Sequence, residues 1–446
     1  MDIIDKSPIN SAYLLLIAWL SIIIGFDGYD IVIYGATVPA LIEEWGISGV
    51  TAGAIGSYTA MGTVIGAFIF GILADKIGRK KVILITISMF SGFTVLSGFA
   101  TGPVFFGITR ILAGLGLGGV MPNVIALSTE FSPKRVRSTI VSVIFCGYSL
   151  GALGAALISR SILPTAGWEP IYWIAGIPLL LIPILIKELP ESINYLLNKG
   201  ENEKIKEILA KFNPEFDKTA NVKFEKAVAK QPGSPVTKLF EHKRAFSTIM
   251  FWISCFSAFV LIYALNTWLP SLMMQVGYDL SSSLVFTAVL QLGAIVGTIV
   301  FGPLVDKLGF KKVLVPLYIA GALGLVYIGF SKVEAIVYVL IFIIGAASFG
   351  SQNLINAFVS QYYPNEIRST GVGTTMGFGR IGGIAAPAII GFVLSMNLMP
   401  QYNFVGIGIA AAIGAIAVLF IQEKYADYNK IADKQASREE VRNIAE

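Results

Sequence analysis

Long apolar runs alternate along the whole chain with short polar segments. About 20 apolar residues, wound as an α-helix with a rise of about 1.5 Å per residue, cross a hydrocarbon layer of about 30 Å. The pattern predicts an all-α polytopic membrane protein. We expect twelve spanning helices, at residues 13–40, 51–74, 82–100, 103–129, 138–161, 170–187, 245–271, 282–304, 313–330, 334–359, 370–395 and 403–421.

Composition agrees with this pattern. The chain has 446 residues, of which 55% are hydrophobic and only 14% charged. Its mean hydropathy of +0.74 is outside the range of ordinary soluble proteins. The first apolar run has no basic segment before it, so we expect it to be retained as the first helix.

The chain repeats itself at an offset of 231 residues. The segment Gly71–Val82 aligns with Gly302–Val313, and other matches keep the same register: Pro39 with Pro270, Pro133 with Pro364, and 137–139 with 368–370. Six spans in each copy give both copies the same orientation. We therefore expect two six-helix bundles related by a pseudo-two-fold axis along the membrane normal, with a binding site between them.

The repeat also suggests domain boundaries. We expect an N-terminal bundle over 1–187, a central linker over 188–244, a C-terminal bundle over 245–421 and a tail over 422–446. Within the linker, Glu201–Phe212 has apolar residues at the spacing of a short amphipathic helix on the membrane surface.

Lysine and arginine are concentrated on one side of the predicted topology. With both termini inside, 29 of the 33 fall in cytoplasmic segments: one before the first helix, four at 76–81, three at 134–137, twelve at 187–244, three at 307–312, one at 368 and five after 421. This bias predicts a cell (plasma or inner) membrane protein with cytoplasmic ends. The net charge of +5 then reflects topology, and we expect no nucleic-acid partner.

Four charged residues lie inside the predicted spans: Asp27, Asp30, Arg110 and Arg380. Each such charge costs several kcal/mol, so intramembrane acids and bases are usually partnered and functional. The residues at the same positions in the other copy are uncharged: Ala258, Leu261, Ile341 and Ser149. We therefore assign the four charges to the chemistry of the protein and the repeated loops to its scaffold.

Depth in the membrane suggests how these charges pair. Arg110 is about 10 Å from the outer end of its helix, and Arg380 is about 15 Å from the inner end of its own. Asp30 is then level with Arg110, and Asp27 is nearer the midplane and Arg380. We expect Asp27, Asp30 and Arg110 to serve proton coupling, with Arg110 paired to the aspartates and tuning their protonation, and Arg380 to bind a substrate carboxylate. The alternative is that both arginines only neutralise the aspartates.

Other polar and aromatic side chains occur inside spans at helical spacing. In lipid they face inward, where they either contact a substrate or join helices to one another. A tryptophan near the end of a span is also a common interface anchor. The candidates for substrate contact are Tyr34, Asn266, Trp268, Gln291, Gln352 and Asn356.

The repeated loop after the second helix of each copy predicts a cytoplasmic gate. Its glycine permits close helix contact, and Asp75 can face a helix N-terminus or an arginine. The tendency of inner loops to be basic explains the lysines and arginines of this loop but not Asp75. The predicted gate residues are Gly71, Asp75, Arg79, Glu130, Arg137, Asp306 and Arg368. Glycine pairs at 114/118 and 147/151 have the spacing of close-packed helices.

Catalysis and metal binding have no support in the sequence. Both cysteines, Cys146 and Cys255, lie inside spans, and the single histidine, His242, lies in a hydrophilic connection. No Ser/His, paired-histidine or metal-ligand set occurs in the spans, so we expect neither an enzyme nor a metal, and no cofactor other than H⁺.

Several of these segments resemble the major facilitator superfamily: Gly71–Lys81, Arg110–Gly119 and Pro190–Ser192. Three more are similar to its aromatic acid:proton symporter branch: Asp27–Asp30, Asn266–Pro270 and Tyr363–Gly371. The resemblance covers nearly the whole chain. It implies uptake of benzoate-type acids driven by the proton gradient. We expect a monomer that works by alternating access.

Charge balance gives the same coupling independently. The two aspartates and two arginines sum to zero, so an added carboxylate needs one added proton. Alternatives are uptake of another small solute (a nicotinate-like acid, a sugar or a polyol) and a membrane sensor that keeps the fold without transporting. The arginines argue against a neutral sugar, since it offers them no charge.

Overall fold

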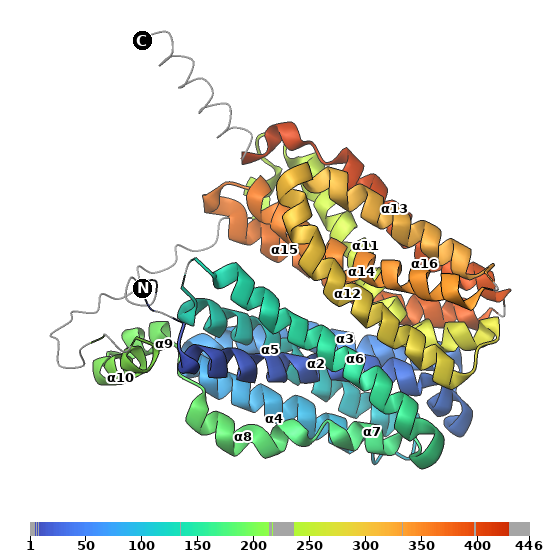
Figure 1. Ribbon diagram of the computed structural model, residues 1–446, viewed down its shortest axis with the longest axis horizontal. Helices are drawn as coiled ribbons and strands as arrows, with labels where there is room; N and C mark the ends of the chain where they lie inside the picture. The colour runs from blue at the N-terminus through green and yellow to red at the C-terminus, as the bar shows by residue number, and fades with distance from the viewer. Residues whose placement is uncertain are drawn as a thin grey trace, which may run out of the picture. The chain divides into compact units, whose positions relative to one another are not determined.

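The computed structural model describes Asp5, Ser7, residues 9–133, 135–213, Phe216, 236–331, 333–396 and 398–427, without the side chains of Ser138 and Asn365. These residues form α-helices, two short 3₁₀-helices (η1, Val236–Phe240, and η2, Glu423–Tyr425) and no strand (Figure 1). Twelve stretches in this part of the chain are long and apolar enough to span a membrane. The predicted all-α, twelve-span architecture is confirmed.

The first half contains six spans and two shorter helices. The spans are α2 (Ser11–Trp45), α3 (Gly49–Ile77), α4 (Arg79–Ser97), α5 (Pro103–Phe131), α6 (Arg137–Ala166) and the pair α7 (Glu169–Ile174) with α8 (Ile177–Glu188). The shorter helices are α9 (Ile193–Lys199) and α10 (Asn202–Phe212). The amphipathic helix expected over 201–212 is therefore present, with Ile205, Leu209 and Phe212 buried.

The second half contains the other six spans. They are α11 (Ala245–Val276), α12 (Leu280–Leu308), α13 (Phe310–Ile328), α14 (Glu334–Tyr362), α15 (Asn365–Ser395) and α16 (Pro400–Phe420). Parts of the predicted linker and tail, residues 217–235 and 428–446, lie outside the described residues, so the predicted domain boundaries stay a prediction.

The sequence repeat reappears in the helix bounds. Adding 231 to both ends of α3, α4 and α5 gives both ends of α12, α13 and α14. Each half also turns between its second and third spans at a glycine with positive φ, at Gly78 (φ 100°) and Gly309 (φ 86°). Because side chains rarely adopt this conformation, glycine is the residue that allows the tight turn.

The sixth predicted span, 170–187, is broken into α7 and α8. The break lies at Ala175 and Gly176, whose backbone N–H groups donate to Tyr172 and Trp173, three residues back. Pro178 follows in the first turn of α8 and has no N–H to donate. The glycine and the proline together account for the break.

The chain forms two compact units. One comprises Met1–Ala229 with Asn266–Gln291, and the other Lys230–Leu265 with Leu292–Glu446. The outer part of α11 and the first part of α12 therefore belong with the first unit. There Arg160 of α6 donates to the Ser281 hydroxyl at 3.0 Å.

Glycines bring helix backbones together inside the first unit. A Cβ added at Gly62 or Gly118 would collide with a carbonyl of the facing helix, Ile111 for Gly62 and Thr63 for Gly118, and one at Gly151 would collide with Gly25. These contacts join α3 to α5 and α2 to α6, and confirm the close packing predicted at 114/118 and 147/151.

Gly71 does not make the close helix contact that the sequence predicts for it. Among the described residues, nothing lies within 4 Å of a Cβ built there. The closest contact of the α3 glycines with α5 is made five residues earlier, at Gly66, which faces the carbonyl of Leu115. The glycine that opens the loop motif is therefore not a helix contact in this structure.

Candidate functional site

The candidate site is built around an ion pair between α2 and α5. Asp30 and Arg110 are both about 1% exposed. Arg110 donates Nη1 to Asp30 Oδ1 at 2.8 Å and Nη2 to Oδ2 at 2.6 Å. This two-pronged geometry is the one that a planar guanidinium and a carboxylate favour. The pairing predicted from helix depth is present.

Two threonines complete the pair. Thr94 of α4 donates its hydroxyl to Asp30 Oδ1 at 2.7 Å, and Arg110 Nε donates to the Thr59 hydroxyl of α3 at 3.2 Å. Four helices thus contribute one side chain each to a single network. We call these four residues, Asp30, Thr59, Thr94 and Arg110, the buried pair network.

The ion pair of the network carries no net charge, and both of its members are buried. A buried pair of this kind is expensive to break, because removal of one partner leaves a charge with no compensation, at a cost of about 3–5 kcal/mol.

Tyrosine hydroxyls join α2 to α3 and α7. Tyr34 donates to the Ala52 carbonyl of α3, and Tyr29 donates to the Ile171 carbonyl of α7 at 2.8 Å. The hydroxyls of Thr37 and Tyr172 are 2.9 Å apart. Tyr34 therefore has a structural contact beside the pair, and its predicted role towards a substrate stays a prediction.

Asp27 and Arg380 lie on different units. Asp27 is half-buried on α2, three residues before Asp30, and Arg380 is half-buried on α15 in the second unit. Their predicted roles, a proton carrier and a carboxylate ligand, stay predictions.

The predicted polar residues of the outer α11 and α12 do meet. Gln291 donates its amide N–H to Asn266 Oδ1 at 2.7 Å, and both side chains are buried. The other amide atom, Gln291 Oε1, is buried and has no hydrogen-bond partner among the described residues. Trp268 is 1% exposed and lies on the same helix as Asn266.

Gln352 and Asn356 lie four residues apart on α14 of the second unit, and both are half-buried. Asn356 Oδ1 is buried and makes no hydrogen bond within the part of the chain that the structure describes. A buried amide oxygen without a donor is costly in an apolar surrounding. Both residues remain candidates for contact with a polar solute.

Part of the predicted gate also comes together. Arg79 Nη1 is 2.8 Å from Glu130 Oε1, which also accepts from the Ser192 hydroxyl at 3.0 Å and from the Asn194 amide. We call these four residues the Glu130 cluster. It joins the start of α4, the end of α5 and the segment that leads into α9.

The other predicted gate residues lie apart from this cluster. Asp75, Asp306 and Arg368 are exposed, and none of the three makes an ion pair among the described residues. Arg137 donates to the Ser132 carbonyl at 3.1 Å and is 3.9 Å from Asp5. The structure thus brings together Arg79 and Glu130 of the predicted set.

The sequence did not single out Thr59, Thr94 or Asn194. A threonine in an apolar span usually bonds to a carbonyl of its own helix, as Thr63 does to Thr59. Nothing in its spacing distinguishes one that reaches a neighbouring helix. For metals, no group of three or more histidine, cysteine or acidic side chains that could hold an ion occurs in the described residues.

Comparison with known proteins adds a family and relatives. A model described as the Major Facilitator Superfamily matches residues 20–387 and, in an overlapping second match, 286–444. The benzoate transport protein of Acinetobacter baylyi is 42% identical over 95% of this chain and 92% of that protein. The gallate transporter of Pseudomonas putida is 34% identical over 94% of each.

A solved structure supports the fold. The crystal structure of a D-xylose-proton symporter superposes with a TM-score of 0.70 and covers 92% of this chain and 97% of that one. At 19% sequence identity, this likeness concerns the fold alone.

Proposed function

The chain belongs to the major facilitator superfamily, and from this premise we propose that it is a proton-coupled symporter. Its cargo in this proposal is a small aromatic carboxylate such as benzoate or a hydroxybenzoate, imported by alternating access. The relatives named above support the substrate class, since they transport benzoate and gallate. Both are aromatic acids that are anionic at neutral pH.

The observation that carries the coupling is the buried pair network. The Asp30 carboxylate and the Arg110 guanidinium are both about 1% exposed and form an ion pair inside a membrane protein. Such groups are seldom kept in a membrane for stability alone, and they mark proton relays in many pumps and transporters. Asp30 is therefore our proton acceptor, with Asp27 as the second.

The net charge of the four intramembrane residues supports the movement of anion and proton together. Asp27, Asp30, Arg110 and Arg380 sum to zero, so a bound substrate anion leaves one negative charge in a medium of low dielectric. One proton on Asp30 or Asp27 restores neutrality. It also loosens the two-pronged contact with Arg110, which gives the helices around it a reason to rearrange.

The remaining roles in the proposal follow from residue type. Arg380 holds the substrate carboxylate through its two donors. Asn266, Gln291, Gln352 and Asn356 offer amide groups to ring substituents, and Tyr34 and Trp268 offer ring surfaces. No cofactor is needed besides H⁺.

The setting of the transporter is also part of the proposal. We expect the cell membrane, with both termini in the cytoplasm, because lysine and arginine are concentrated in the segments that this orientation places inside. We expect the single chain to be the working unit, with a six-span bundle from each half of the repeat.

The test uses purified protein in proteoliposomes. Labelled benzoate should accumulate when the outside is acidic, and the lumen should acidify with it. A protonophore should remove both effects. Uptake that neither needs the pH gradient nor acidifies the lumen would contradict proton symport.

A counterflow screen without a gradient identifies the substrate. Preloaded benzoate, hydroxybenzoates, nicotinate, short aliphatic acids and xylose are compared. We expect exchange with the aromatic acids and none with xylose. Exchange with xylose alone would overturn the substrate class while leaving the fold assignment intact.

A further inference from the structure

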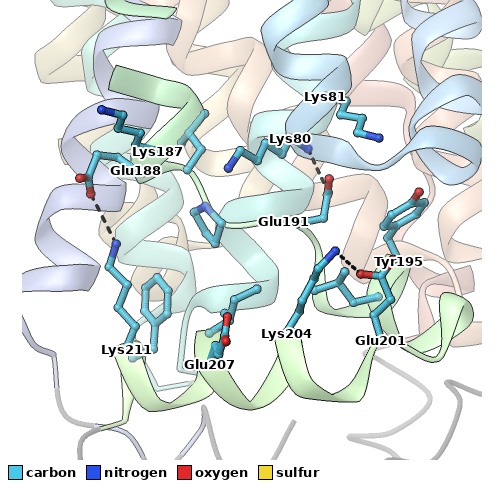
Figure 2. A pocket seen from close by; sticks show the side chains of 15 residues that line it. Lys80, Lys81, Lys187, Glu188, Glu191, Tyr195, Glu201, Lys204, Glu207 and Lys211 are labelled. Carbon is cyan, nitrogen blue, oxygen red and sulfur yellow. Dashed lines mark hydrogen bonds and ion pairs between the residues drawn. The ribbon is translucent and has the colours of Figure 1, made fainter. Parts of the chain in front are cut away.

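A cavity of about 460 Å³ lies in the first unit, at the end of the bundle where α8 leads into α9 and α10. It is formed by the start of α4, the end of α8 and the faces of α9 and α10 that turn towards them (Figure 2). Its size is within the range of small-ligand sites. The buried pair network does not reach it, since Lys80 and Thr94 are 14 residues, or about 21 Å, apart along α4.

Charged side chains line most of this cavity. Five are lysines and four are glutamates. Two of the glutamates are already paired: Glu188 Oε2 with Lys211 at 3.4 Å, and Glu201 Oε2 with Lys204 at 2.5 Å. The hydrogen bond and charge of Glu201 also raise the pKa of Lys204. These two pairs therefore leave no net charge.

Glu191 is committed to the backbone. Its Oε1 accepts the N–H of Lys80 at 3.1 Å and that of Ser192 at 2.9 Å. Lys80 is in the first turn of α4, where helix N–H groups have no partner within the helix and favour a negative charge. The carboxylate of Glu191 is thus used as a helix cap.

Three ammonium groups are left over, on Lys80, Lys81 and Lys187. None lies within 4.0 Å of a carboxylate in the described part of the chain. The charge of Glu191 acts on Lys80, and the exposed carboxylate of Glu207 acts on Lys204. With five lysines against four glutamates, the lining of the cavity keeps one positive charge in excess.

Its position relative to the membrane identifies the kind of anion. Lys80 and Lys81 open the spanning helix α4, and Lys187 is in the last turn of the spanning pair α7 and α8. Lysines at span ends lie at the level of lipid headgroups. The buried side chains of Leu189, Leu196 and Phe212 give the cavity an apolar wall beside these charges.

We propose that this cavity binds a phosphate-bearing anion, with Lys80 and Lys187 as its direct contacts and the headgroup of an anionic phospholipid as the expected source. Basic pockets at the ends of spanning helices bind such headgroups through the phosphate, while the rest of the lipid lies along the neighbouring helices. The site is independent of the proposed symport.

The experiment compares the full-length protein with a Lys80→Gln/Lys187→Gln variant. Each is reconstituted in nanodiscs of phosphatidylcholine containing a small fraction of labelled phosphatidylglycerol, and the label retained after extraction into mild detergent is measured. The matched control is Lys199→Gln/Lys206→Gln, which removes the same charge from α9 and α10 outside the cavity lining. Size-exclusion profiles and thermal melts confirm that all three proteins are folded.

We expect the wild type and the control to retain the label and the cavity variant to lose about tenfold in affinity, the factor that corresponds to about 1.4 kcal/mol. Competition with inorganic phosphate and with glycerol 3-phosphate then distinguishes the sources. Displacement by millimolar soluble phosphate indicates a free anion, and resistance to it indicates the lipid. Equal retention by the cavity variant and the control, or no retention by the wild type, would overturn the proposal.

Discussion

At the scale of single residues, the buried pair network shows how a membrane helix accommodates a charge. Asp30 accepts two hydrogen bonds from Arg110 and one from Thr94, and Arg110 donates a third hydrogen bond, from Nε, to Thr59. Each partner comes from a different helix. The cost of burying the two charges is thus offset only when α2, α3, α4 and α5 are all in place.

The first prediction concerns that pair. Asp30→Asn leaves the guanidinium of Arg110 buried without a counter-charge, and we expect it to lower the unfolding free energy by about 3–5 kcal/mol. Asp30→Asn/Arg110→Gln should regain much of that stability but not pH-driven uptake. Thermal unfolding in detergent and uptake by proteoliposomes measure the two effects.

The control for unfolding is Asp306→Asn, since that aspartate is exposed and makes no ion pair among the described residues. If the double variant transports with normal pH dependence, the pair serves the fold and the proton travels elsewhere.

The second prediction separates Asp27 from Asp30. Asp27 is half-buried and lies outside the buried pair network, so Asp27→Asn should spare folding. We expect it to slow pH-driven uptake at least about tenfold, or about 1.4 kcal/mol, while substrate counterflow continues. The comparison of gradient-driven uptake with counterflow measures this split. Loss of membrane expression equal to that of Asp30→Asn would contradict the division of roles.

Sequence reasoning reached Asp30 and Arg110 because intramembrane charges are rare and helix depth can be counted residue by residue. It did not reach Thr59 and Thr94, because threonine is ordinary in spans. It also favoured Asp75, which is exposed, over Ser192 and Asn194, which join Glu130. Ser192 and Asn194 reach Glu130 because the segment after α8 passes beside the end of α5. No local sequence pattern predicts that path.

At the scale of helices, small residues decide which elements approach most closely. Gly62 and Gly66 of α3 face the carbonyls of Ile111 and Leu115 on α5. In the second half, Gly293 faces Phe342 in the same way. Those positions are 231 residues after Gly62 and Ile111, so this packing contact is repeated along with the sequence.

The third prediction tests this contact against a glycine of the same helix. Gly62→Ala places a methyl group against the α5 backbone and should destabilise the protein by about 1–3 kcal/mol. Gly71→Ala has nothing within 4 Å and should be neutral or gain up to about 1 kcal/mol from helix propensity. Thermal melts of both variants give the comparison. Equal melting temperatures would show that the α3 and α5 backbones separate easily.

The Glu130 cluster belongs to this scale as well. It fastens the starts of α4 and α9 to the end of α5 through Arg79, Ser192 and Asn194. We propose it as part of the inner gate. Phe212 packs against Tyr13 and Phe131 nearby, so α10 is attached to the same end of the bundle.

At the scale of the whole molecule, the repeat and the charge bias predict the topology before any contact is considered. The span count, the repeated glycines at 78 and 309, and the matched bounds of α3, α4 and α5 with α12, α13 and α14 all agree with patterns visible in the chain. The break between α7 and α8 does not, because a hydropathy pattern does not show where backbone N–H groups donate three residues back, as at Ala175 and Gly176, or where a proline such as Pro178 has no N–H to donate.

The fourth prediction tests the orientation. A cysteine at Lys199 should react with a membrane-impermeant maleimide only in inside-out vesicles, and one at Glu334 only in intact cells, because the positive-inside bias places them on opposite sides. The native Cys255 is buried and Cys146 half-buried within a span, which keeps the background low. Labelling of both positions from one side would contradict the predicted topology.

The equality of helix lengths between the halves has a consequence for the kinds of change the chain tolerates. Over α3, α4 and α5 the two copies differ at most positions yet keep the same number of residues in every helix and turn. One residue added inside a helix rotates everything beyond it by about 100°, because a turn takes about 3.6 residues. In α5 that rotation would carry Arg110 out of line with Asp30. These helices therefore tolerate many substitutions, whereas the insertion or deletion of one residue changes which side chains contact one another.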